Sequence, residues 1–307
     1  MGTASKGKRD VTRQQKIAAQ RAAARSTQVR RRILLAGGSI ITVVAVVVAL
    51  VLVKAGSGQG TASASSEGPA GAALHGLVSD VTSVPASVLD TVGQGSLSSD
   101  ALTRVSGPAL TSGGKPELLY VGANFCPFCA AERWPMIVAL SRFGTFSGLT
   151  TTHSSNTDEY PGTPTFTFSG SSYKSKYLSF VPVEETTNYR QGNSASPNVP
   201  YVTLQTPTAA EQSLLDKYDP GTDGNSIPFI DIGNRYVEIS NLAPYGPQNL
   251  SGKTWNQVAA ALRDPSTAIA QGADASANYL TAGICTLTGN QPASACTTAV
   301  RALEPQL

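Results

Sequence analysis

The sequence predicts an α/β fold, in which helices flank a mixed central sheet that carries a β-rich insert, preceded by one N-terminal transmembrane helix. Three observations support this prediction. Residues 33–53 are an uncharged apolar run, residues 116–143 read as a strand, a CxxC motif and a helix, and residues 225–240 read as two strands around a turn. Strands that alternate with helices indicate a sheet covered by helices.

The N-terminal segment predicts a membrane anchor. Residues 1–32 hold ten Lys or Arg against one acid, and the next 21 residues (33–53) carry no charge. As a helix this run would span about 31 Å, close to the hydrocarbon thickness of a bilayer. A cleavable signal peptide is the alternative, but its apolar region is usually about 7–15 residues long. The positive-inside rule then leaves residues 1–32 in the cytoplasm and exports the rest of a single-pass cell-membrane protein.

The exported part is mildly acidic and contains all four cysteines. After residue 32 the chain holds 13 of the 23 basic residues and 19 of the 20 acids, a formal charge of −6, so we expect no nucleic acid partner. Residues 54–73 are rich in Gly, Ser and Ala and predict a flexible tether. Residues 74–307 then form one extracytoplasmic domain, in a compartment where disulfides form and persist.

The first elements of this domain predict a βαβ unit. The apolar run at 116–123 reads as a buried strand, Cys129 to Phe143 as a helix with Pro135 as a kink or early end, and 148–155 as the second strand. Residues 156–207 suggest two further strands or a hairpin.

The remaining elements are mainly helical. Thr208 and Glu211 have the spacing of a capping box at the start of a short helix. The segment 225–240 predicts two antiparallel strands around a Gly-Asn turn. Further helices are expected at 254–264, in the stretch that ends at Cys285, and at 292–303.

The motif Cys126-Pro127-Phe128-Cys129 lies where the first strand leads into the helix. A helix N-terminus offers unpaired N–H groups and a positive dipole end, which stabilise a thiolate. We therefore expect Cys126 to be the more exposed sulfur and the nucleophile, and Cys129 to be the resolving thiol. Pro127 suits the first helical turn, and Phe128 provides an apolar face at the rim.

A second signal occurs a hundred residues later in the sequence NSIPFIDI. Pro228 directly precedes an apolar strand, a position in which a cis X-Pro bond makes a suitable turn. We expect this loop to lie against Cys126, where the backbone of Ile227 would be available to a passing peptide.

With these residues the chain resembles the thioredoxin fold. It also resembles an uncharacterised prokaryotic family, domain-of-unknown-function family 929, in its N-terminal membrane helix, in YVGANFCPFCAAERWPMIVALSRFG, in TPTFTF and in the late cysteine pair. The likeness covers most of residues 75–305. By position it implies Cys126 as nucleophile, Cys129 as resolver and Pro228 as the cis proline. The insert at about 154–207 is larger than a minimal thioredoxin needs.

The cysteines allow two other roles. A closed zinc site needs four ligands, and the further candidates Cys285, Cys296, His75 and His153 lack the usual spacing, so we expect neither metal nor cofactor. A purely structural Cys126–Cys129 bridge is the other alternative. We expect Cys285 and Cys296 to form a structural disulfide between the ends of two helices.

Three further residues have simpler explanations than a role in the site. Glu132 lies one turn after Cys129 and could relay its proton, but a surface salt bridge with Arg133 or a solvated position is favoured. Trp134 is expected in the core, and His153 is expected to be packed or hydrogen-bonded.

The leading functional hypothesis is a membrane-anchored thiol–disulfide oxidoreductase that acts on exported protein thiols or disulfides, or exchanges electrons with a membrane redox partner. The alternatives are a non-catalytic binding scaffold with a permanent CxxC disulfide and a metal-handling thiol protein. No motif sets the direction of electron flow, because the direction depends on the relative stability of the thiolate and disulfide forms.

Overall fold

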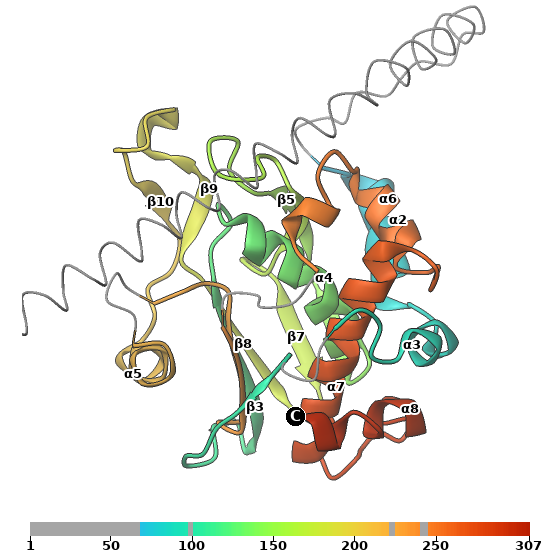
Figure 1. Cartoon of the computed structure of the whole chain (residues 1–307). Helices are drawn as coiled ribbons and strands as arrows, with labels where there is room; N and C mark the ends of the chain where they lie inside the picture. The colour runs from blue at the N-terminus through green and yellow to red at the C-terminus, as the bar shows by residue number, and fades with distance from the viewer. Residues whose placement is uncertain (1–67, 98–100, 221–224, 240–244) are drawn as a thin grey trace, which may run out of the picture. The chain divides into compact units, whose positions relative to one another are not determined.

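The computed structural model describes residues 68–97, 101–220, 225–239 and 245–307 (Figure 1). The predicted cytoplasmic arm (1–32) and transmembrane helix (33–53) lie outside these residues. The first described helix, α2 (Gly71–Thr82), begins within the end of the predicted tether. In the described part of the chain no single helix is long and apolar enough to cross a membrane. Taken together, α2 and α3 (Ala86–Val92) have the length and composition of a membrane span, but they are bent by 53° relative to each other.

A six-stranded mixed sheet forms the centre of the domain. Its strands follow the order β1, β12, β11, β3, β2, and β8 also pairs with β3. The pairing of β3 with β8 is parallel, and the other pairings are antiparallel. The strands are β1 (Thr103–Arg104), β2 (Thr111–Ser112), β3 (Lys115–Gly122), β8 (Ser179–Glu184), β11 (Phe229–Ile232) and β12 (Tyr236–Ile239).

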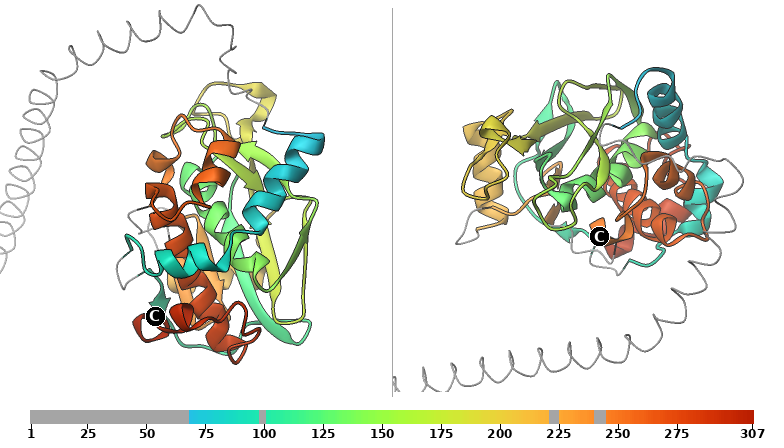
Figure 2. Two further views of the ribbon diagram at one scale, coloured as in Figure 1. Left: turned by 90° about the vertical axis from the view of Figure 1, so that its right-hand side faces the viewer. Right: turned by 90° about the horizontal axis from the view of Figure 1, so that it is seen from above.

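Helices cover both faces of this sheet. Side chains alternate along a strand, so Leu118 and Tyr120 of β3 point into the larger core, while Leu119 and Val121 point into a second, smaller one. Helix α5 (Ala209–Tyr218) packs over the smaller core, on the side opposite α4 and α7 (Figures 1 and 2). The mixed α/β architecture agrees with the sequence prediction, as does the capping box that opens α5.

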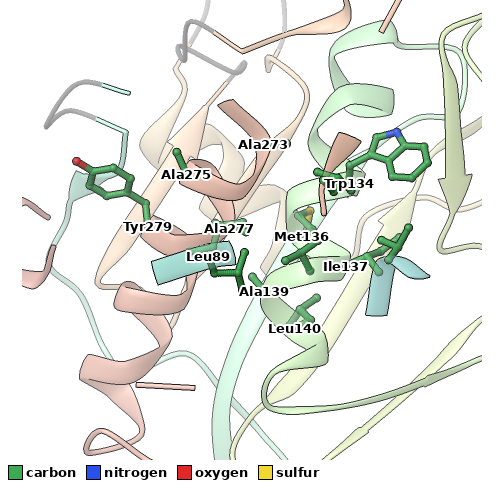
Figure 3. Packing of buried hydrophobic residues seen from close by; sticks show 14 of the residues in the cluster. Leu89, Trp134, Met136, Ile137, Ala139, Leu140, Ala273, Ala275, Ala277 and Tyr279 are labelled. Atoms are coloured by element: carbon green, nitrogen blue, oxygen red, sulfur yellow. The ribbon is translucent and has the colours of Figure 1, made fainter. Parts of the chain in front are cut away.

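Helix α4 (Pro127–Ser141) is buried between the sheet and α7 (Ala275–Leu287), and it continues through Pro135. A π-helical turn, η3 (Ala270–Asp274), precedes α7, and alanines along η3 and α7 leave room for the larger side chains of α4 (Figure 3). Trp134 is fully buried as predicted. The remaining helical segments are α6 (Trp255–Ala261), α8 (Thr298–Arg301), η1 (Gln191–Asn193), η2 (Pro247–Asn249) and η4 (Glu304–Gln306).

The predicted βαβ unit has a different second strand. Residues 150–153 form β5, which pairs with β6 (Pro164–Thr167) in a separate two-stranded sheet. The parallel partner of β3 is β8, which the prediction had placed in the insert. Parallel strands tend to be apolar, and β8 (SFVPVE) is the more apolar of the two strands, whereas β5 is a threonine run. Two further strand pairs involve the insert. Strand β7 (Ser172–Ser175) pairs with β4 (Gly144–Ser147), which precedes the insert, and β9 (Thr186–Arg190) pairs with β10 (Tyr201–Thr203).

The C-terminal helix is much shorter than predicted. Only Thr298–Arg301 is α-helical, because the Thr297 hydroxyl caps this helix by accepting a hydrogen bond from the Val300 N–H. Cys285 and Cys296 form the predicted disulfide, which ties the end of α7 to the loop before α8. Closing a loop of 11 residues stabilises the fold by about 3 kcal/mol in the chain-entropy account.

Candidate active site

The two cysteines of the CPFC motif lie at the N-terminus of α4, directly after β3. Cys126 is the N-cap residue, and its sulfur accepts a hydrogen bond from the Cys129 N–H at 3.3 Å. Pro127 occupies the first helical turn as predicted, where its missing N–H costs nothing. Both cysteines are free thiols. Cys126 is 5% exposed and Cys129 is fully buried, so Cys126 is the one that a partner can reach first.

The proline loop lies beside Cys126. The Ile227–Pro228 peptide bond is cis, and the Ile227 carbonyl oxygen is 3.8 Å from the Cys126 sulfur. Strand β11 begins immediately after Pro228 and pairs with β3, with Phe229 opposite Val121. This pairing brings the loop, 101 residues away in the sequence, to the start of α4.

The two thiols differ in acidity. The pKa of Cys126 is lowered, chiefly by a hydrogen bond from the Cys129 thiol, while burial opposes the shift and the Cys129 N–H and Arg133 support it. The pKa of Cys129 is raised well above its usual value, first by burial and then by its hydrogen bond to Cys126 and the charge there. The outer thiol is therefore the better nucleophile near neutral pH.

A buried ion pair lies behind the cysteines. Arg133 donates from Nε and Nη2 to the carboxylate of Glu184 at 2.9 and 2.6 Å, and both side chains are fully buried. Glu184 ends β8 opposite Gly122 of β3, and its Oε1 also accepts the Phe168 N–H. The sequence did not lead us to predict this role of Glu184. The signal available for it was an acidic residue at the end of the apolar run SFVPVE.

The prediction for Glu132 was wrong. Glu132 is buried rather than solvated, and Arg133 pairs with Glu184 instead. The Glu132 carboxyl lies within hydrogen-bonding range of Glu238 on β12 and of Ser276 on α7. Burial, followed by the charge of Glu238, raises the pKa of Glu132 well above its usual value. The helix is covered on all sides, so no face of it is available for a surface salt bridge.

Aromatic side chains from the insert flank the motif. The Phe125 ring stacks on Tyr201 with ring centres 4.3 Å apart, and Phe128 makes an edge-to-face contact with Tyr160 at 6.3 Å. Two backbone hydrogen bonds, from the Asn124 N–H to Thr186 and from the Ser155 N–H to Phe125, attach the insert to this loop. Tyr189, on β9 of the insert, is 52% exposed. The insert therefore forms part of the surface around Cys126.

Three of the other candidate ligands, Cys285, Cys296 and His153, are engaged elsewhere. Cys285 and Cys296 are bonded to each other, and His153 Nδ1 lies 2.7 Å from the Ser154 carbonyl oxygen, so His153 is hydrogen-bonded as predicted. His75 lies on α2. Within the described ranges no three His, Cys, Asp or Glu side chains come together as metal ligands.

Comparison with protein families gives one match. The profile of a family described as a domain of unknown function, DUF929, matches residues 101–286, more than half of the chain. The chain belongs to the DUF929 family. No curated protein and no solved structure matched it.

The DUF929 match includes every element that builds the site. It begins just before β1 and ends within α7, so it contains the CPFC motif, Glu184 on β8 and the cis Pro228. It also contains Cys285, whereas Cys296 lies outside the matched residues. The disulfide thus joins the DUF929 region to the C-terminal segment of this chain.

Proposed function

We propose that this DUF929 protein is a membrane-anchored thiol–disulfide oxidoreductase of thioredoxin-like fold that acts on exported proteins through Cys126 and Cys129. The observation that carries the proposal is the N-cap Cys126, with its lowered pKa, placed 3.8 Å from the carbonyl oxygen that precedes the cis proline. The backbone beside a cis proline, next to a reactive sulfur, can hold an extended peptide while the cysteine of that peptide reacts.

The arrangement of elements supports a thioredoxin-like fold. Strand β3, helix α4 and the parallel strand β8 are followed by the antiparallel pair β11–β12, which starts at the cis proline, and by α7 packed on α4. The insert adds aromatic side chains around Cys126, and these would favour substrates with apolar residues near their cysteines.

The reaction is an exchange of disulfide bonds. In the oxidising direction a substrate thiolate attacks the Cys126 sulfur, the Cys126–Cys129 bond breaks, and Cys129 leaves as a thiolate. A second substrate thiolate then attacks the substrate sulfur of the mixed disulfide, which forms the substrate disulfide and releases Cys126 as a thiolate. Two electrons pass from the substrate dithiol to the cysteine pair, and the reverse sequence reduces a substrate disulfide.

The location follows from the N-terminal sequence. An apolar run at 33–53 behind a basic arm would anchor the chain and hold the domain outside the cell membrane. The substrates are then exported proteins, and a membrane redox partner would return the cysteine pair to its starting state.

A trapping experiment tests this function. The full-length Cys129→Ser protein, expressed in cells, is expected to retain substrate proteins as mixed disulfides on Cys126, because no resolving thiol remains to release them. The double variant Cys126→Ser/Cys129→Ser is the matched control and should retain none. The function is rejected if Cys129→Ser traps no protein through Cys126 and the wild type does not turn over a small disulfide peptide. That outcome would leave a scaffold with an inert disulfide.

A further inference from the structure

The loop that joins β5 to β6, residues 154–163, is attached to the CPFC motif and to the helix that follows it. The Ser155 N–H donates to the carbonyl of Phe125, the residue before the motif, at 2.9 Å. At the base of the β5–β6 hairpin, Trp134 of α4 donates from Nε1 to the Pro164 carbonyl at 2.9 Å. These two hydrogen bonds fix the loop beside the start of α4.

Tyr160, in this loop, has a left-handed backbone conformation with a φ of 49°. The conformation is uncommon for residues other than glycine, and a bulky residue keeps it only where its surroundings hold it. Two buried hydroxyls hold Tyr160: Ser154 Oγ and Thr163 Oγ1 donate to its carbonyl oxygen at 3.0 and 2.8 Å. The Ser154 hydroxyl also accepts the Thr163 N–H at 2.9 Å. The loop therefore fixes the position of Tyr160 despite its unfavourable backbone.

The Tyr160 ring meets the motif itself. It makes its edge-to-face contact with Phe128, which lies between the two cysteines, and both side chains are partly exposed. Among the described residues Tyr160 has no second aromatic partner, and its hydroxyl makes no hydrogen bond. Partly exposed aromatic rings offer a large apolar surface at a small cost in conformational entropy. Tyr160 and Phe128 therefore present apolar surface next to the cysteines.

The second aromatic contact of the site differs from this one. The Tyr201 ring lies parallel to the Phe125 ring, with planes 7° apart, and the Arg190 guanidinium lies 4.0 Å from the centre of the Tyr201 ring. Two groups this close cannot share one face of a ring, so both faces of Tyr201 are covered. Tyr201 has no face left for a substrate side chain, whereas Tyr160 has a single ring partner.

We propose that Tyr160 selects the substrate: together with Phe128 it binds an apolar side chain next to the substrate cysteine while that cysteine reacts with Cys126. The proposal rests on the function given above and names the substrate class, exported chains whose cysteine lies in an apolar segment. Such segments are mostly buried once a protein has folded, so the substrates are incompletely folded chains.

The test uses two peptides, each with one cysteine in a mixed disulfide with thionitrobenzoate, that differ only in the residues flanking the cysteine, leucine or serine. The Cys126 thiolate attacks the peptide sulfur, the Cys126–peptide disulfide forms, and thionitrobenzoate leaves as a coloured thiolate whose absorbance gives the rate. Reduced full-length wild-type protein should react about tenfold faster with the leucine peptide than with the serine peptide.

Tyr160→Gly should reduce this preference to about twofold or less, because it removes the ring from a backbone conformation that glycine adopts readily. Tyr160→Phe should keep the preference, since the ring remains and the hydroxyl makes no described bond. Asn193→Gly is the matched control and should also keep it: Asn193 has a φ of 53°, but it is exposed between β9 and β10 and carries no ring. The rate with glutathione disulfide should be the same in all four proteins, because it reports the reactivity of Cys126 alone.

The outcomes separate this inference from the proposed function. Wild-type protein that reacts equally fast with both peptides, or a Tyr160→Gly protein that keeps the full preference, overturns the role of Tyr160 even if trapping through Cys126 succeeds. A Cys126 that reacts with neither peptide nor glutathione disulfide contradicts the proposed function itself. If Tyr160→Gly does not fold, Tyr160→Asn replaces it, because asparagine also tolerates the left-handed conformation. A full preference for leucine in that variant overturns the proposal in the same way.

Discussion

Replacing Arg133 by methionine is expected to lower the free energy of unfolding by about 3–5 kcal/mol. The substitution leaves the fully buried Glu184 carboxylate without its bidentate partner, and an unpaired buried charge is strongly unfavourable. Chemical denaturation of the domain, followed by circular dichroism, measures the effect.

The double variant Arg133→Met/Glu184→Gln identifies the cause of this loss. Glutamine is neutral and can still accept the Phe168 N–H, so the double variant should recover more than half of the lost stability. Arg142→Met is the matched control: Arg142 bonds the Asn278 side chain and the Ala295 carbonyl, both uncharged, and its loss should cost about 1 kcal/mol. A double variant as unstable as Arg133→Met contradicts the ion-pair explanation.

Raising the pH from about 5 to about 8 is expected to destabilise the domain by on the order of 4 kcal/mol for each buried acid whose pKa is raised to about 8. Burial raises the pKa of Glu238 to about 8 and that of Asp274 to about 8, and it raises the pKa of Glu132 well above its usual range. In the unfolded chain these acids titrate near pH 4. Between those values the unfolded state binds fewer protons, so stability is highest at low pH and falls as the pH rises. Urea unfolding at a series of pH values measures this slope.

Asp274→Asn should flatten this slope by about a third, because one of the three buried acids no longer titrates. Both carboxylate oxygens of Asp274 lack a partner among the described groups, so asparagine removes the charge without breaking a described bond. Asp264→Asn is the matched control, since Asp264 is exposed and its pKa is lowered by Ser266, below the window. A wild-type stability that is constant or rises between pH 5 and 8 would show that these acids do not titrate as described.

Local sequence signals predicted the elements that carry the cysteines. Strand β3, the CPFC motif and α4 follow one another in the chain, and their apolar runs and bounding Gly and Pro residues are visible in a short window. The partner of β3 could not be chosen in this way, because both β5 and β8 are rich in β-formers. The choice depends on which strand the rest of the chain brings beside β3, and that is a property of the whole fold.

The site was predictable where a motif fixes the chemistry. Cys126, Cys129 and the cis Pro228 belong to such motifs, and so does the disulfide cysteine pair. The role of Glu184 depends on β8 pairing with β3 and on Arg133 of α4, three separate segments that meet behind the cysteines, so no local pattern reveals it. The environments of Glu132 and Arg133 were misassigned because helical spacing identifies a solvent face only when the helix has one. Charged residues inside the apolar helix of AERWPMIVAL were the signal that these side chains are buried and paired.

The most direct test of a reactive Cys126 thiolate is the pH profile of iodoacetamide modification of the fully reduced domain, with the modified residue located by mass spectrometry. We expect Cys126 to react with a midpoint below about 8.5, the value of an ordinary cysteine, and Cys129 to remain unmodified over the same range. A midpoint for Cys126 at or above that value, or preferential modification of Cys129, would contradict the proposed redox couple.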